Sequence, residues 1–176
     1  MRQYIRMTGK HKTPRPLAPS IESAFAMATQ YDGSENEERA LNAYIRLTRA
    51  FTTVDRKIGE TFRARDLTSG QFGVLETIYH LGPMYQGQLG EKLLQSKGNI
   101  STIITNLVER GLVKRQRDPD DRRYVKIHLT NEGETLIDDL FPDHLQQIVK
   151  TFGVLDPEEI EELGRLCKKL GVANAE

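Results

Sequence analysis

Apolar residues recur at steps of three and four positions through most of the chain, which is the spacing of one face of an α-helix. The longest such pattern covers residues 35–65, with an apolar stripe of Leu41, Ile45, Phe51, Val54, Ile58 and Phe62. A helix of that length would measure roughly 45 Å at about 1.5 Å per residue. Because a small domain rarely needs so long a helix for its own core, we expect this helix to pack against a second chain.

Two shorter helices are predicted next. The first begins at a capping box formed by Thr68 and Gln71 and ends before Gly82. The second covers about 86–95 and has Gly90 at its centre. Glycine is unfavourable inside a helix unless another helix crosses closely, so a tight helix crossing is expected there.

A third short helix, from Ser96 to Arg110, has an apolar face and an unusual polar one. Its inward stripe is Ile100, Ile103, Ile104, Leu107 and Val108. The other face carries small hydroxyl and amide side chains, which are weak helix formers but are suited to contacting base edges and phosphates. We therefore predict a DNA-recognition helix with candidate contacts at Lys97, Gly98, Asn99, Ser101, Thr102, Thr105 and Asn106.

After this helix the apolar period changes to two, which predicts a β-hairpin. Its strands are residues 112–117 and 124–129. The loop between them, residues 118–123, is too polar to be buried and carries Arg122 and Arg123. The hairpin is therefore expected to protrude as a basic wing.

Two helices are predicted to close the chain. One begins at Thr130 or Asn131, and Pro142 should bend it or divide it in two. The last begins at Asp156, followed by a proline and two acidic residues in its first turn. Cys167 lies on the apolar stripe of that helix, so we predict a buried, inert thiol.

The formal net charge is +0, but the charges are unevenly distributed. Residues 1–16 carry five basic residues and no acidic one, and residues 92–126 carry nine basic against four acidic. Residues 131–176 carry four basic against eleven acidic. This pattern indicates a basic face, suited to phosphates, in front of an acidic body.

Several classes of protein are disfavoured. No apolar run is long enough to span a membrane, and the single cysteine cannot form an internal disulfide, so a cytoplasmic protein is expected. The four histidines share no metal-ligand spacing, and no catalytic constellation can be named. We predict no metal, no cofactor and no enzymatic activity.

Short helices, a small wing and long flanking helices predict a mainly α protein with a winged helix-turn-helix. From Leu67 to Gly133 the chain resembles the MarR (multiple antibiotic resistance regulator) family of bacterial transcription factors. The resemblance is carried by LTSGQFGVLETI, GQLGEKLL, GNISTIITNLVERGLVKR and DPDDRRYVKIHLTNEG. The chain departs from the family at Tyr85, where a Thr or Ser cap is usual. Gly98 either lets the backbone approach DNA closely or is simply tolerated near a helix cap.

The resemblance implies a homodimer whose long N-terminal helix packs on the C-terminal helices of the other copy. The helix from Lys97 to Arg110 would enter the major groove and the wing the minor groove of double-stranded DNA. Arg123 matches the minor-groove arginine of the family, and Asp121 matches the acidic residue that orients it. By position, Arg115, Arg117 and Arg122 suit phosphate contacts.

Members of the family often bind small aromatic or phenolic anions. An effector pocket between the dimerisation helices and the DNA-binding region would be lined by Tyr44, Phe51, Phe62, Phe72 and Tyr79, although such residues are more often plain core.

The chain is thus expected to have four segments: a basic arm with a short helix (1–34), an N-terminal dimerisation helix (35–66), a DNA-binding region (67–130) and C-terminal dimerisation helices (131–176). The expected function is a repressor that binds a pseudopalindromic operator and is released by an effector. It would be cytoplasmic, and nucleoid-associated when bound to DNA. Two alternatives remain open, a winged-helix protein-interaction module and a thiol redox sensor that uses Cys167.

Overall fold

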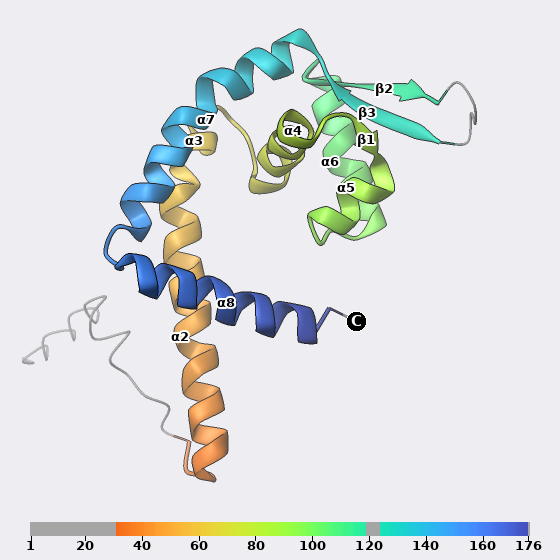
Figure 1. The fold of residues 1–176 in the computed structure, drawn as a ribbon. Helices are drawn as coiled ribbons and strands as arrows, with labels where there is room; N and C mark the ends of the chain where they lie inside the picture. Colours follow the sequence, from red (N-terminus) through yellow and green to blue (C-terminus); the bar gives the residue numbers. More distant parts are fainter. Residues whose placement is uncertain (1–30, 119–123, 176) are drawn as a thin grey trace, which may run out of the picture. The chain divides into compact units, whose positions relative to one another are not determined.

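The computed structural model describes residues 31–118 and 124–175. The chain divides into two compact units, Met1–Phe51 and Thr52–Glu176. Figure 1 shows the helices and strands in chain order. They are α2 (Glu35–Ile58), α3 (Glu60–Arg63), α4 (Ser69–Leu81), β1 (Met84–Tyr85), α5 (Gln86–Lys92), α6 (Lys97–Glu109), β2 (Val113–Arg117), β3 (Val125–Leu129), α7 (Asn131–Phe152) and α8 (Pro157–Ala173). Of the basic arm predicted over residues 1–34, with its short helix, only residues 31–34 are described.

The single helix predicted over residues 35–65 is interrupted in the structure. α2 ends at Ile58, and α3 begins only at Glu60, with Gly59 between them. Glycine is a poor helix former, so it is a favourable place for the helix to break. α3 then ends in a turn in which Asp66 takes a left-handed conformation with φ 56°.

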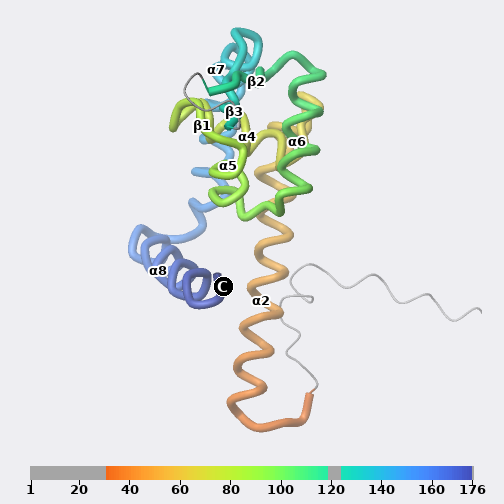
Figure 2. Tube along the Cα trace, turned by 90° about the vertical axis from the view of Figure 1, so that its right-hand side faces the viewer, coloured from red at the N-terminus to blue at the C-terminus, as the bar shows by residue number. Residues whose placement is uncertain are grey.

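The helices α4, α5 and α6 form the helix-turn-helix, and their caps agree with the sequence. The Thr68 hydroxyl accepts a hydrogen bond from the Gln71 amide at 3.2 Å, and the Gln71 side chain accepts one from the Thr68 amide at 2.9 Å. Ser96 caps α6 with its hydroxyl alone, which accepts from the Asn99 amide at 3.3 Å. Figure 2 shows α5 and α6 side by side. A Cβ on Gly90 would lie 3.5 Å from the Ile100 side chain of α6, and 3.3 Å from the Gln95 carbonyl oxygen in the turn between the helices. The two helices therefore cross closely at Gly90, as predicted.

The wing belongs to a three-stranded antiparallel sheet of order β1-β3-β2. In β2 and β3, Val113 pairs with Leu129 and Arg117 with Val125. The two-stranded prediction missed β1, in which Tyr85 pairs with Lys126. A strand of two residues is too short to show the alternation from which strands are predicted.

α7 begins at Asn131 and is capped by Thr130, whose hydroxyl accepts from the Gly133 amide at 3.1 Å and donates to the Gly111 carbonyl at 2.6 Å. A Cβ on Gly133 would lie only 2.0 Å from the Leu112 carbonyl oxygen, so only glycine allows this helix to start against the hairpin. Pro142 does not divide α7, which runs continuously to Phe152. Because Pro142 is exposed, water can bond the carbonyl oxygen that its missing N–H leaves free.

Among the described residues, the buried hydrophobic core comes from residues 62–140, that is, from α3 to the first half of α7. It is built around fully buried residues of α4, α5, α6 and β3, namely Val74, Leu75, Leu89, Ile100, Ile104, Leu107 and Ile127. α2 and α8, which the structure describes throughout, contribute no buried residue. The core thus holds the recognition helix and the hairpin in one body.

Candidate nucleic-acid interface

The recognition helix α6 presents its candidate contacts on the side away from the core. Ile100, Ile103, Ile104 and Leu107 are buried, as their spacing predicted. The exposed positions are Lys97, Gly98, Asn99, Thr102 and Asn106, whereas Ser101 and Thr105 are half-buried. Each successive turn of α6 therefore exposes an amide or a hydroxyl group at the surface.

Hydrogen bonds within α6 fix several of these side chains. The Thr102 hydroxyl donates to the Gly98 carbonyl at 3.1 Å, and the Thr105 hydroxyl donates to the Ser101 carbonyl at 2.9 Å. The Asn99 amide side chain donates to Gln95 in the turn before the helix. Both threonine hydroxyls keep lone pairs with which they can accept, and the methyl groups of the side chains have fixed directions.

A Cβ on Gly98 would meet no other atom within 4 Å. Packing within the protein therefore does not require glycine at this position, and both interpretations of Gly98 stay open.

Arg115 joins the wing to the recognition helix. Its guanidinium donates to the Thr105 hydroxyl at 2.8 Å, from β2 to α6. The Arg115 side chain is nevertheless exposed, as are Lys114, Gln116 and Arg117 along the same strand. The structure thus brings Arg115 and Arg117 to the surface that continues from α6. Asp121, Arg122 and Arg123 lie outside the described residues.

Burial and the neighbouring lysines both act on the histidine of the hairpin. Burial lowers the pKa of His128, and the positive charges of Lys114 and Lys126 lower it further. His128 is therefore neutral at pH 7, and the positive charge of the hairpin is carried by lysine and arginine.

Sequence reasoning missed two connections that hold this surface in place. The Arg110 guanidinium, at the end of α6, donates to the Asp66 carbonyl at 2.8 Å and to the Arg65 carbonyl at 3.4 Å. The Tyr85 hydroxyl donates to the Asp118 carboxylate at 2.6 Å. Both bonds join residues more than thirty positions apart, and no local pattern in the sequence signals such pairs.

The five candidate pocket residues do not share one environment. Phe62 and Phe72 are buried and stack with ring centroids 5.1 Å apart, and Phe72 also packs against His144 at 4.4 Å. Tyr79 donates a hydrogen bond to Asp138 and is partly exposed. Tyr44 and Phe51, in the first unit, are 65% and 67% exposed. The pocket that would join all five stays a prediction.

Cys167 is exposed, so the prediction of a buried thiol is wrong for the single chain. The helical stripe that suggested burial exists, but nothing in the described part of the chain covers it. A redox role for Cys167 stays a prediction.

Among residues 31–118 and 124–175, no three His, Cys, Asp or Glu side chains gather as a metal site would require. Over the same residues, no helix combines the length and apolar character needed to cross a membrane.

Comparison with known proteins shows which family has this helix-turn-helix and wing. A sequence model described as the MarR family matches residues 67–125, the helix-turn-helix and most of the hairpin. The transcriptional regulator YkoM of Bacillus subtilis is 36% identical over 138 residues, which cover 78% of this chain and 90% of YkoM. The chain belongs to the MarR family. It is a winged helix-turn-helix transcriptional regulator, as the sequence predicted.

Solved structures of family members have the same fold. A mutant of MarR from E. coli, in complex with operator DNA, is 25% identical to this chain and superposes with a TM-score of 0.68. The match covers 79% of this chain and 99% of the MarR chain. BpsR from Bordetella bronchiseptica, whose DNA binding is regulated by 6-hydroxynicotinic acid, is 28% identical with a TM-score of 0.64, and covers 71% of this chain and 95% of its own.

Proposed function

We propose that this MarR-family regulator is a homodimer that binds a pseudopalindromic operator in double-stranded DNA and represses transcription. The observation that carries the proposal is the continuous surface formed by the polar face of α6 and the basic strand β2. Lys97, Asn99, Thr102 and Asn106 are exposed on that face. A helix of this kind fits the major groove, where amide and hydroxyl groups distinguish base pairs.

The wing supplies contacts to the DNA backbone and the minor groove. Arg115 and Arg117 are exposed on β2 next to α6, where they would reach phosphates. Arg123, oriented by Asp121, would enter the minor groove, and Arg122 would bind a phosphate, as the family resemblance implies. A narrow minor groove concentrates negative potential and so favours arginine.

Dimerisation is supported by the exposed apolar stripe of α8. Ile160, Leu163, Leu166 and Leu170 recur at helical spacing and are 39–55% exposed. A soluble helix seldom leaves so regular an apolar stripe in water, and a second copy of the chain would cover it. A dimer would also place two recognition helices about one turn of DNA apart.

Release from the operator would follow binding of a small aromatic anion. The similarity to BpsR, whose ligand is an aromatic acid, supports this class of effector. The effector need only bind one arrangement of the two DNA-binding regions more tightly than the other. Action on chromosomal DNA places the protein in the cytoplasm.

The test is to select bound duplexes from a random pool and to measure the affinity of the selected site at several salt concentrations. Thr102→Ala and Asn106→Ala should change which bases are preferred, since their side chains would face base edges. Arg117→Ala should weaken binding to all sequences and reduce the salt slope by about 1, as expected for one lost phosphate contact.

Absence of any selected sequence would contradict the proposal. An affinity independent of salt would favour a protein-interaction module instead. Titration of aromatic acids against the bound complex then tests the effector, and failure of all of them would reject only that part.

A further inference from the structure

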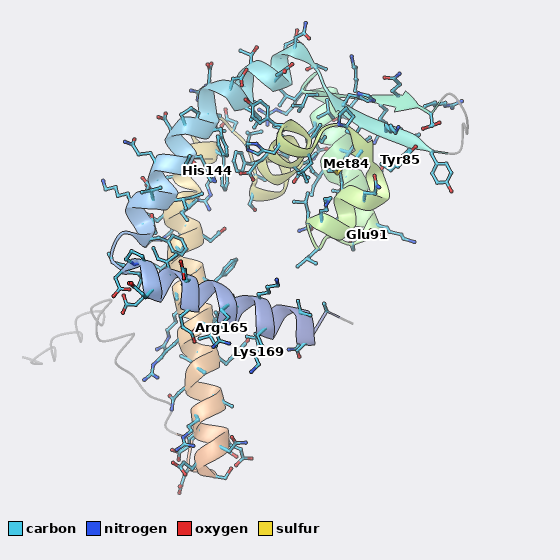
Figure 3. All side chains as sticks on the ribbon, in the orientation of Figure 1. Met84, Tyr85, Glu91, His144, Arg165 and Lys169 are labelled. Carbon is cyan, nitrogen blue, oxygen red and sulfur yellow. The ribbon has the colours of Figure 1, made fainter. Side chains whose placement is uncertain are left out.

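Tyr85 touches both ends of the wing loop. Its hydroxyl donates to the Asp118 carboxylate at 2.6 Å, where β2 ends. Its ring packs against the ring of Tyr124, just before β3, with centroids 5.5 Å apart. The Asp118 amide donates to the Tyr124 carbonyl at 3.0 Å, which closes the loop at its base. Figure 3 labels Tyr85 on β1 beside the hairpin.

Lys126 completes this arrangement from β3. Its ammonium lies 3.6 Å from the Asp118 carboxylate and 5.1 Å from the centre of the Tyr85 ring. The Asp118 side chain is only 11% exposed, so its charge is satisfied by the protein more than by water. The carboxylate raises the pKa of Tyr85, so the phenol keeps the proton that it donates.

Tyr85 also caps the start of α5. Its backbone amide donates to the Gln88 side chain at 3.0 Å, at the beginning of α5. One residue therefore connects α5, the helix before the recognition helix, with both ends of the wing loop. A Thr or Ser cap, which the family usually has here, is too short to reach Asp118.

We propose that Tyr85 is a positioning residue, which sets the direction of the wing relative to the recognition helix by holding Asp118 and Tyr124. The inference rests on the proposed function, in which the wing contacts the minor groove. It adds a specific device of this chain: Asp118, an acidic residue next to a DNA-binding loop, strengthens binding because it anchors the wing.

Two variants separate anchoring from charge. Tyr85→Phe removes only the hydroxyl, and we expect operator affinity to fall on the order of tenfold, as for a lost hydrogen bond to a charged group. Asp118→Ala removes a negative charge close to phosphates, which by charge alone would tighten binding. If Asp118 anchors the wing, Asp118→Ala weakens binding instead, and the double variant is no weaker than the worse single variant.

Footprinting of the full-length protein on its selected operator shows which groove is affected. Hydroxyl radicals attack sugars from the minor groove, whereas dimethyl sulfate methylates guanine N7 in the major groove. Tyr85→Phe should lose protection of the minor groove and keep protection of the major groove. Equal loss in both grooves, or tighter binding by Asp118→Ala, would overturn the proposal.

A measurement without DNA keeps this inference distinct from the proposed function. In the free protein, Tyr85→Phe should raise the rate of trypsin cleavage after Arg122 and Arg123 by roughly fivefold, because the loop base opens more often. Thr61→Val is the matched control, since it removes a side-chain hydrogen bond to His144, away from the wing.

An unchanged cleavage rate in Tyr85→Phe, or the same increase in Thr61→Val, would refute anchoring whether or not the protein binds DNA. Faster cleavage together with no DNA binding by the wild-type protein would refute the proposed function alone.

Discussion

α6 and α8 are built from similar apolar residues at similar spacing, yet they end in opposite surroundings. In α6, Ile100, Ile103, Ile104 and Leu107 are at most 8% exposed. In α8, Ile160, Leu163, Leu166 and Leu170 are at least 39% exposed. Both helices are capped by a side chain, Ser96 and Asp156 respectively, so the difference does not arise in local structure.

The difference lies in what the rest of the chain provides. α6 packs against α4, α5 and β2, which are adjacent in sequence and fold with it. α8 belongs to the acidic C-terminal part of the chain, and none of its residues is buried. An amphipathic stripe in a sequence therefore predicts that a surface will be covered, without telling whether the covering residues belong to the same chain.

The largest effect is expected when charged residues are placed in the exposed apolar stripe of α8. Leu163→Glu combined with Leu166→Glu should abolish the proposed dimer, because burying two carboxylates is prohibitive. A monomer holds one recognition helix, so operator affinity should fall by about a thousandfold, the scale of lost bivalency. Sedimentation velocity and a DNA titration measure the two effects.

Lys168→Glu is the control, since Lys168 lies on the other side of α8 and also gains negative charge. If the double variant remained dimeric, the stripe would not be the interface.

The same substitution in the two helices sharpens the contrast. Leu107→Ala should reduce the free energy of unfolding by about 2–5 kcal/mol, as for a fully buried leucine. Leu163→Ala should cost less than about 1 kcal/mol in dilute protein, because Leu163 is 39% exposed in the single chain and only a dimer would remove the rest of its surface from water. Urea denaturation at several protein concentrations distinguishes the two.

The loss of unfolding free energy caused by Leu163→Ala should grow with protein concentration, whereas the loss caused by Leu107→Ala should not. Equal deficits at all concentrations would mean that α8 is covered by its own chain.

These two regions also show what a sequence can predict. Capping at Thr68, Ser96 and Asp156 depends on residues three positions apart, and all three caps are present. β1 and the bond between Tyr85 and Asp118 depend on residues more than thirty positions away, and they were missed. The exposure of Cys167 could not be foreseen either, because the apolar stripe beside it only indicates that some surface covers the helix.

The DNA contacts illustrate the same division. Helical spacing was enough to separate Thr102 and Asn106 from the buried isoleucines of α6. It did not reveal that Arg115 is held by Thr105, since that bond joins a strand to a helix. Side-chain chemistry at one element can thus be predicted from spacing, whereas contacts between elements need the fold.

The smallest expected effect concerns His144, at the place where α3 and α7 meet α4. His144, labelled in Figure 3, is 5% exposed. Its ring packs against the stacked pair Phe62 and Phe72, and its Nδ1 lies 2.8 Å from the Thr61 hydroxyl. Burial lowers its pKa below the ordinary 6.5. The unfolded chain therefore takes up a proton below about pH 6.5 that the folded protein refuses.

The contribution of neutral His144 to the free energy of unfolding is therefore fully present above pH 6.5. It is lost as the pH falls from 6.5 toward the lowered pKa of His144. His144→Gln cannot titrate, so its free energy of unfolding should change less between pH 7.5 and 5 than that of the wild type. Contributions from His128 and Glu76 are common to both proteins and cancel in the difference. Parallel pH profiles would show that His144 is protonated equally in both states, and that water reaches a junction which the structure closes.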